Sequence, residues 1–155
     1  MIETMSMTVT DEQHAAVVRG RVARRDLAGF LDWAFPEVSH ALSRQGLSPT
    51  GPPICRYHLA APASPTDSDG LGAFDVAAGF PCDTAITGVG EVVPAVLPGG
   101  SVLTALHVGP WSDVGEVYEA AETWLARHDL IPAGDPWESY LDEPGVSVHR
   151  TLVSI

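Results

Sequence analysis

An internal repeat with a constant offset of 83 residues constrains this chain more than any other feature. The repeat is clearest when Arg44–Tyr57 is compared with Arg127–Tyr140, because six of these 14 positions are identical. Prolines and glycines also match by chance, but a constant offset through both segments favours a duplicated unit. The identical pairs are Arg44/Arg127, Leu47/Leu130, Pro49/Pro132, Gly51/Gly134, Pro53/Pro136 and Tyr57/Tyr140.

The repeat extends back into two predicted amphipathic helices. Apolar residues recur at helical spacing from Leu27 to Leu42, and again from Val114 to Leu125. Pro36 is expected to kink or break the first helix, and Ser112 is a candidate N-cap of the second. Each helix is followed by a Leu-x-Pro-x-Gly-x-Pro connection, in which proline and glycine stop the helix.

Strand-like runs flank both predicted helices. They cover residues 7–10, 15–19, 54–59 and 73–77 in the first half, and 92–97, 101–108, 137–141 and 147–155 in the second. A tight turn is expected at 98–100 and an exposed loop at 60–72, which is rich in Pro, Ser, Asp and Gly. The sequence therefore predicts a single α+β domain over residues 1–155. It consists of duplicated β-β-α-β-β halves (about 7–82 and 90–155) with pseudo-twofold symmetry, antiparallel sheets and a ligand cleft between the halves.

Charge and composition exclude several classes of function. The 155 residues include 20 acidic and only 8 basic residues, so the formal net charge is −12. Such a chain repels phosphate backbones, which argues against direct nucleic-acid binding. No apolar run approaches the roughly 20 residues that span a bilayer, and the N-terminus lacks a signal-peptide pattern. Two cysteines do not form a disulfide framework, so we expect a cytoplasmic protein.

Common cofactor and metal motifs do not occur in the sequence. It contains no G-x-G-x-x-G after a strand, no phosphate-binding G-x-x-x-x-G-K-[ST] and no G-x-S-x-G. The six histidines have no metal-ligand spacing, and the pair Cys55 and His58 is too small a set for zinc. We therefore predict neither a metal nor an organic cofactor.

The segment Pro136–Leu141 carries the strongest indication of a ligand site. On a strand, residues two apart share a face, so Glu138 and Tyr140 point one way and Trp137 the other. The repeat gives Cys55 and Tyr57 the equivalent positions in the first half, and pseudo-symmetry brings the two strands together. A carboxylate surrounded by aromatic rings suits a flat cationic ligand, and it can also act as a general base or acid. The alternative is that Glu138 is a solvated residue on an edge strand.

Other aromatic residues have less specific interpretations. Trp111, in the run His107-Val-Gly-Pro-Trp111, either overhangs the cleft as a lid or packs against the start of the second helix. The aromatic residues on helical faces are expected to pack in the core, and Cys82 is expected to be a small buried residue. These helical aromatic residues are Trp33, Phe35, Tyr118 and Trp124.

The paired motifs resemble the GyrI-like small-molecule-binding domain, which is also the effector-binding domain of certain multidrug-responsive transcription activators. The resemblance covers about residues 7–155. One departure is Trp111, where the family often has tyrosine. The resemblance is carried by Phe35-Pro-Glu-Val38, Gly51-Pro-Pro53, Arg56-Tyr57-His58, Phe74-Asp-Val-x-Ala-Gly-Phe-Pro81, His107-x-Gly-Pro-Trp111 and Leu130-x-Pro-x-Gly-x-Pro-Trp-Glu138-x-Tyr140.

This resemblance implies a duplicated fold whose hydrophobic cleft binds aromatic, often cationic, ligands against Glu138. Regulator members carry an additional DNA-binding domain. Because nothing before Met7 forms a helix-turn-helix, we expect a stand-alone form. Stand-alone relatives are associated with gyrase inhibition, toxin protection or drug sequestration, and some resemble hydrolases that open the cyclopropane ring of DNA-alkylating natural products.

Three functions follow as hypotheses. The first is sequestration of apolar aromatic compounds, with cationic or genotoxic ones as candidates, by Glu138, Tyr140, Tyr57, Cys55, Trp111 and Trp137. The alternative is a cofactor-independent hydrolase with Glu138 as general base and Tyr57 or Tyr140 as hydrogen-bond donor. The third is contact with DNA gyrase through the acidic surface, although acidic residues also serve solubility alone.

Overall fold

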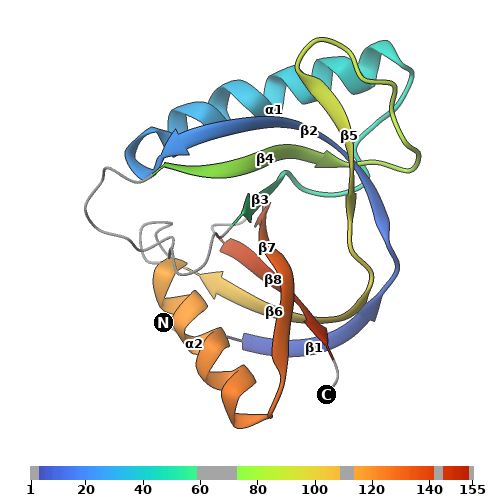
Figure 1. The fold of residues 1–155 in the computed structure, drawn as a ribbon. Coiled ribbons are helices and arrows are strands. Elements are labelled where there is room, and N and C mark those ends of the chain that lie inside the picture. Colours follow the sequence, from blue (N-terminus) through green and yellow to red (C-terminus); the bar gives the residue numbers. More distant parts are fainter. Residues whose placement is uncertain (1–3, 59–72, 109–113, 142–144, 154–155) are drawn as a thin grey trace. The chain divides into compact units, whose positions relative to one another are not determined.

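The computed structural model describes residues 4–58, 73–108, 114–141 and 145–153. It confirms the expected α+β class, with two helices and antiparallel sheets (Figure 1). None of the helices described is long and apolar enough to cross a membrane. The elements are β1 (Thr4–Thr10), β2 (Gln13–Ala23), a 3-10 turn (Arg24–Asp26), α1 (Leu27–Arg44), β3 (Ile54–His58), β4 (Ala73–Pro81), β5 (Val92–Leu97), β6 (Gly100–Val108), α2 (Val114–Arg127), β7 (Ile131–Leu141) and β8 (Gly145–Val153).

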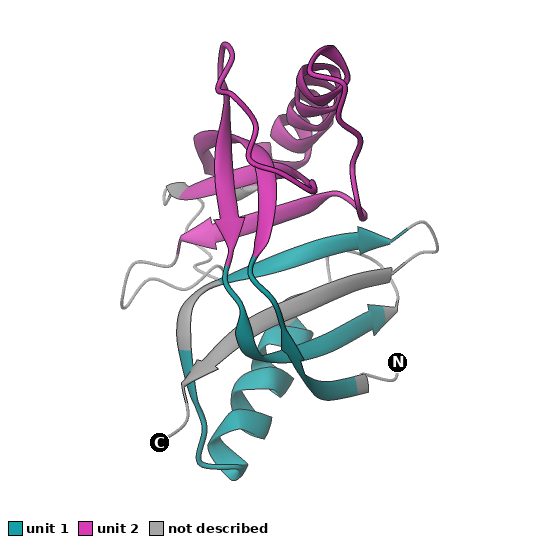
Figure 2. Ribbon diagram, turned by 90° about the vertical axis from the view of Figure 1, so that its right-hand side faces the viewer, with its two compact units in different colours: residues 1–12, 98–155 teal, residues 13–97 magenta. Residues whose placement is uncertain are grey.

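The chain divides into two compact units, which Figure 2 colours separately. Unit 1 comprises residues 1–12 and 98–155, and unit 2 comprises residues 13–97. In unit 1 the strand order is β1-β6-β8-β7, and α2 packs mainly on β6. In unit 2 the order is β5-β2-β4-β3, and α1 packs on β2 and β4. All of these strand pairs are antiparallel.

The two units have the same topology but are not the two halves of the sequence. In each unit the outermost strand comes from the other half of the chain, because β1 pairs with β6 and β5 pairs with β2. The expected boundaries at about 7–82 and 90–155 therefore differ from the boundaries of the compact units. The glycine-rich turn at 98–100 consequently closes no hairpin, since β5 and β6 have other partners.

Both helices bury the expected apolar stripe and end alike. The stripe of α1 includes buried Leu31, Ala34 and Val38, whereas Trp33, which was expected in the core, lies outside the stripe and is 42% exposed. The helix continues through Pro36, so the expected break does not occur; this proline lies on the exposed side. Each helix is followed two residues later by a residue with positive φ. These residues are Gly46 (φ 71°) and Asp129 (φ 54°), positions that the repeat aligns.

The strand after α2 begins earlier than the sequence predicted. We expected it over residues 137–141, whereas β7 begins at Ile131 and pairs with β8 over residues 131–133 and 137–141. The ladder shifts register between Ala133 and Trp137, and such an irregularity accommodates prolines within a sheet. The candidate cap Ser112 and the predicted loop 60–72 lie outside the described residues.

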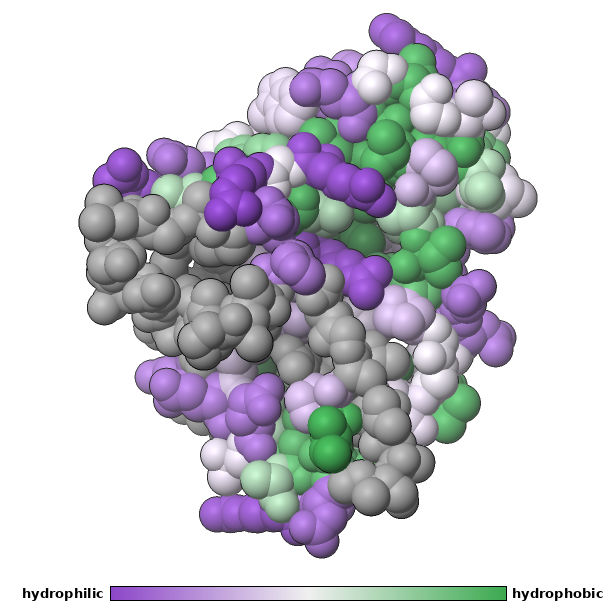
Figure 3. Space-filling view, viewed as in Figure 1, coloured by the Kyte–Doolittle hydropathy of each residue, from purple (hydrophilic) through white to green (hydrophobic). Residues whose placement is uncertain are grey.

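Hydrophilic and hydrophobic side chains are interspersed on the face drawn in Figure 3. Such a mixed surface is usual for a folded chain, since apolar atoms always contribute much of the accessible surface.

Candidate functional site

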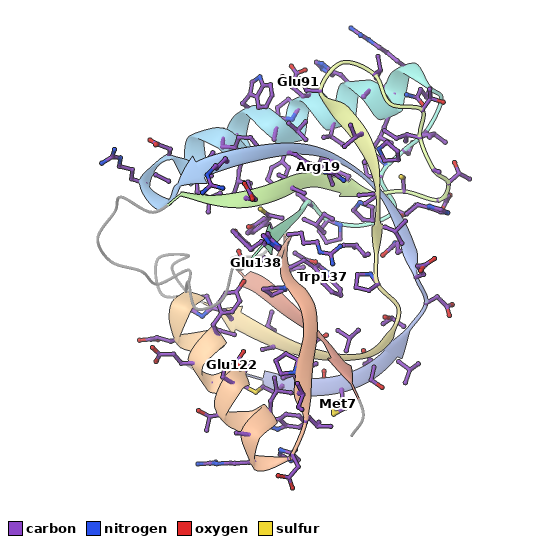
Figure 4. All side chains as sticks on the ribbon, in the orientation of Figure 1. Met7, Arg19, Glu91, Glu122, Trp137 and Glu138 are labelled. Atoms are coloured by element: carbon purple, nitrogen blue, oxygen red, sulfur yellow. The ribbon has the colours of Figure 1, made fainter. Side chains whose placement is uncertain are left out.

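Strand β7 directs Glu138 and Tyr140 to the side of the unit 1 sheet that α2 covers. In the ladders, Glu138 is opposite Val148, which is opposite Ala105 on β6. Ala105 packs with Val117 of α2, and both Tyr118 and Tyr140 contact this cluster. The strand alternation predicted for this segment therefore holds. Figure 4 labels Glu138 and its neighbour Trp137 on β7.

The carboxylate of Glu138 is buried and is held at both oxygens. The Tyr118 hydroxyl donates a hydrogen bond to Oε2 at 2.7 Å, and the Tyr140 hydroxyl donates one to Oε1 at 2.8 Å. Only 3% of Glu138 is exposed. Hydrogen bonds to an ionised acceptor are short and strong, so the two phenols fix the orientation of the carboxylate. We call Tyr118, Glu138 and Tyr140 the tyrosine–glutamate cluster. The alternative of a solvated Glu138 is wrong.

Tyr118 is the residue that sequence reasoning missed in this cluster. Helical spacing predicted a core aromatic residue, and its ring does pack against Ala105 and Val117. The hydroxyl performs a second role that helical periodicity does not reveal. The repeat contained a usable signal, because it aligns Tyr118 with Phe35, so the second helix carries a polar atom where the first has none.

A buried histidine lies on the same side of the sheet. His107 is fully buried, and the ladders place it in one row with Tyr140, across Val146 of β8. The sequence placed His107 at the end of an expected strand and in a family motif, but did not indicate it as a site residue. Its position makes it a neighbour of the tyrosine–glutamate cluster by register.

The predicted site residues of the first half occupy the matching positions in unit 2. Cys55 and Tyr57 on β3 are both buried. Tyr57 is in one row with Val76 and Gly20, and Gly20 adjoins the Phe30 ring of α1. The two residues therefore point to the helix-covered side of their own sheet. That they share one cleft with Glu138 stays a prediction.

Two predicted tryptophans contribute differently. Trp137 is 6% exposed, and alternation along β7 directs it to the side opposite Glu138. A role for it in binding the same ligand stays a prediction. Trp111 lies outside the described residues, so its role as a lid stays a prediction.

The chemistry of Cys82 is that of a buried, protonated thiol. Cys82 is 1% exposed, as expected for a small core residue. Burial raises its pKa, and the nearby Asp83 carboxylate raises it further. A thiol with a raised pKa is a poor nucleophile at neutral pH. Among the described residues, no three His, Cys, Asp or Glu side chains gather as metal ligands.

Solved structures of known proteins share this fold. The C-terminal domain of EcmrR is 16% identical to this chain, and the two structures match with a TM-score of 0.79 over 100% of each chain. EcmrR in a complex with DNA has a TM-score of 0.81 and 15% identity. In that comparison, 100% of this chain is matched, but it spans only 59% of the EcmrR chain. At these identities the likeness establishes the fold alone.

Further matches with lower scores include a hydrolase and a ligand complex. A hydrolase from Listeria innocua is 11% identical, with a TM-score of 0.64, covering 96% of this chain and 91% of that chain. SAV2435 bound to tetraphenylphosphonium is 8% identical, with a TM-score of 0.62, covering 99% of this chain and 95% of that chain. No curated protein matches the sequence.

The family assignment rests on the sequence as a whole. The GyrI-like small molecule binding domain matches residues 4–154, which is nearly the entire chain. The α+β architecture and the similarity to the EcmrR C-terminal domain agree with this match. The chain therefore belongs to the GyrI-like small molecule binding domain family.

Proposed function

We propose that this protein binds aromatic cations at the tyrosine–glutamate cluster and protects by sequestering them. One observation carries the proposal: a carboxylate only 3% exposed whose two oxygens each accept a hydrogen bond from a tyrosine hydroxyl. A buried carboxylate is costly to maintain, and such groups are concentrated at functional sites.

The two phenols suit this role because they orient the charge without neutralising it. Each donates a hydrogen bond from an uncharged hydroxyl, so neither tyrosine forms an ion pair with Glu138. A cation near a partly desolvated carboxylate is attracted more strongly than in bulk water. Aromatic rings favour cations over their faces. A cation whose charge is spread over aromatic groups combines both attractions and loses little hydration.

The comparisons support this class of ligand. The family is a small-molecule-binding family. A protein of similar fold, SAV2435, has been solved with tetraphenylphosphonium, a cation with four aromatic rings. We therefore choose tetraphenylphosphonium as the first probe for this chain.

Calorimetric titration of tetraphenylphosphonium into the wild type and Glu138→Gln tests the proposal. Glutamine keeps the size and removes the charge, so we expect affinity to fall roughly 30- to 5,000-fold, which corresponds to the 2–5 kcal/mol range for a desolvated charge pair. Glu119→Gln, an exposed residue of α2, is the matched control and should bind like the wild type. Triphenylphosphine oxide supplies a neutral probe of similar shape.

Two results would contradict the charge role of Glu138. One is an unchanged affinity of Glu138→Gln for the cation. The other is an equal loss for the cation and for triphenylphosphine oxide, which would indicate damage to the shape of the site. Recovery of chemically intact ligand from the complex is required for sequestration.

Hydrolysis is the second candidate, and the Tyr140–Glu138 contact favours it. At 2.8 Å the phenol and the carboxylate are close enough to exchange a proton. In the proposed reaction, Glu138 accepts a proton from water and the water oxygen bonds to a cyclopropane carbon. The ring C–C bond breaks, and its electron pair moves to the conjugated carbonyl oxygen, where the Tyr140 hydroxyl stabilises the charge. Tyr140 then gives its proton to that oxygen and recovers one from Glu138, which completes the addition of one water and restores the carboxylate.

Mass spectrometry distinguishes the two functions. Incubation with a cyclopropane-bearing alkylator should yield repeated turnover to a product heavier by one water if the protein is a hydrolase. Glu138→Gln should then be slower by about 10²- to 10⁴-fold, the usual effect of losing a general base. Intact ligand in a stoichiometric complex supports sequestration, and an adduct on Cys55 indicates covalent trapping.

A further inference from the structure

Strand β1 forms an unprotected edge. Among the described strands it pairs with β6 alone, along all of its seven residues. It contains no charged residue and no proline. Met7 is 45% exposed and Val9 is 82% exposed (Figure 4 labels Met7). Uncharged exposed edges of this kind readily accept another strand.

The outer strand of unit 2 provides an internal contrast. Strand β5 pairs with β2 and ends its sheet in the same topological position as β1. It carries Pro94, which cannot donate a ladder hydrogen bond and so discourages pairing with another chain. Among the described residues, one of these two equivalent edges is thus protected and the other is left open.

The open edge is complementary to itself. A two-fold axis through Met7 places Met7 opposite Met7 of a second copy, and Met5 opposite Val9. The same axis places Ser6 opposite Thr8 and Thr4 opposite Thr10. Apolar residues thereby face apolar residues, and hydroxyls face hydroxyls, in every pair. We propose that β1 is a homodimerisation edge, at which two copies of this chain pair in antiparallel register about Met7.

The pairing has a predictable strength and salt dependence. It covers Met7 and Val9 and satisfies the outward backbone groups of β1, but one strand pair is a small interface, and small interfaces are weak. Each copy carries a net charge of −12, and exposed Asp11 and Glu12 follow the strand. The copies therefore repel each other, and added salt should strengthen the dimer by screening that repulsion.

Sedimentation velocity over a concentration series tests the association. We expect the dimer fraction to rise with protein concentration, over about 5 to 500 µM, and with salt concentration, because interfaces below about 1,200 Å² are weak. Met7→Lys should be monomeric throughout, because it places two lysines opposite each other at the axis. Val96→Lys is the matched control on β5, where Val96 is 41% exposed, and it should dimerise like the wild type.

Wild-type protein that stays monomeric at the highest concentration and salt would overturn the proposal. So would a Met7→Lys variant that dimerises as the wild type does. Lysine lowers the net negative charge, so a dimer limited only by repulsion would be strengthened by this substitution. Circular dichroism establishes that each variant is folded.

Cysteine crosslinking tests the register. In the proposed pair the two Met7 side chains are neighbours, about 4.5–5.5 Å apart at Cβ, so Met7→Cys should form a disulfide-linked dimer under mild oxidation. Val9→Cys is the control, since two copies of Val9 lie about four residues apart along the pair, or roughly 13 Å. Val9 is more exposed than Met7, so crosslinking by random collision would be faster for Val9→Cys than for Met7→Cys. Crosslinking of Val9→Cys as fast as Met7→Cys would overturn the register. The native cysteines are buried.

Discussion

Units 1 and 2 share a topology but differ in chemistry at two of three aligned positions. Where unit 2 has Phe35 and Cys55, unit 1 has Tyr118 and Glu138; the third position is tyrosine in both, as Tyr57 and Tyr140. In each unit the first of these positions lies on the helix and the other two lie on the strand that follows it. A hydroxyl at one position and a carboxylate at another thus create the polar cluster without a change in the order of the strands.

The helix position shows how packing and chemistry are divided. In unit 2, Phe35 makes an edge contact with Phe80, with ring centroids 5.8 Å apart. In unit 1, the Tyr118 ring packs against Ala105 and Val117 while its hydroxyl reaches Glu138. The ring therefore serves the core in both units, and only the added oxygen distinguishes the candidate site.

The largest effect we expect comes from a backbone contact in unit 2. Gly79 lies in one ladder row with Val17 and Ile54, whereas the corresponding row of unit 1 contains His149. A Cβ on Gly79 would collide with the backbone carbonyl of Ala16, which cannot yield as a side chain can. Gly79→Ala should therefore destabilise the protein by about 3 kcal/mol or more, as severe overpacking does.

Urea unfolding and soluble yield measure this effect. Gly29→Ala is the control within unit 2, because a Cβ there meets nothing and α1 gains a better helix former. It should be neutral or stabilising by up to about 1 kcal/mol. A Gly79→Ala variant as stable as Gly29→Ala would show that the strands of unit 2 separate more easily than the structure indicates.

Converting the tyrosine–glutamate cluster to the residues of unit 2 tests the comparison directly. Tyr118→Phe removes one donor from a buried carboxylate and should cost about 1.5–3 kcal/mol. Adding Glu138→Cys removes the carboxylate that required the donor. The double variant should therefore lose less stability than the two single losses combined.

A double-mutant cycle from urea unfolding yields the coupling between Tyr118 and Glu138. We expect about 1–2 kcal/mol, within the range for residues that share a hydrogen bond. Additive losses would mean that the Tyr118 hydroxyl does not stabilise the carboxylate. Tetraphenylphosphonium affinity should fall in both variants that lack Glu138 and change less in Tyr118→Phe.

Local periodicity predicted much of this fold, and long-range pairing accounts for what it missed. The apolar stripes and the repeat located both helices, and strand alternation placed Glu138 and Tyr140 on one face. The exchange of β1 and β5 between the units was not predictable, because nothing local to a strand specifies its partner.

Two further differences have local causes that the sequence left ambiguous. A proline inside a helical pattern often ends the helix. Pro36 lies on the exposed side of α1, and burial of the apolar stripe on the opposite side stabilises the helix despite the proline. Helical spacing did not predict the role of the Tyr118 hydroxyl, because the ring of this residue packs in the core as a phenylalanine ring would. Whether Cys55 and Tyr57 join Glu138 in one cleft stays a prediction.

The smallest effect concerns the helix ends, where the units carry different residues in the same left-handed conformation. Gly46 follows α1 with φ 71°, and Asp129 follows α2 with φ 54°. In both, the next residue's backbone N–H donates to a carbonyl of the last helical turn: Leu47 to Leu42 at 2.9 Å, and Leu130 to Leu125 at 3.0 Å. The closing geometry is therefore the same, and glycine is the residue it favours.

Asp129→Gly should raise the free energy of unfolding by about 0.5 kcal/mol. Relief of the left-handed strain contributes about 1 kcal/mol, and the greater freedom of glycine in the unfolded chain offsets about half of it. The reverse change, Gly46→Asp, should lower stability by a similar amount; a Cβ there meets no other atom, so only backbone conformation is tested. Thermal unfolding of both variants measures the pair. If Asp129→Gly destabilises the protein, the aspartate side chain contributes more to the turn than its conformation costs, and the two helix ends are not equivalent.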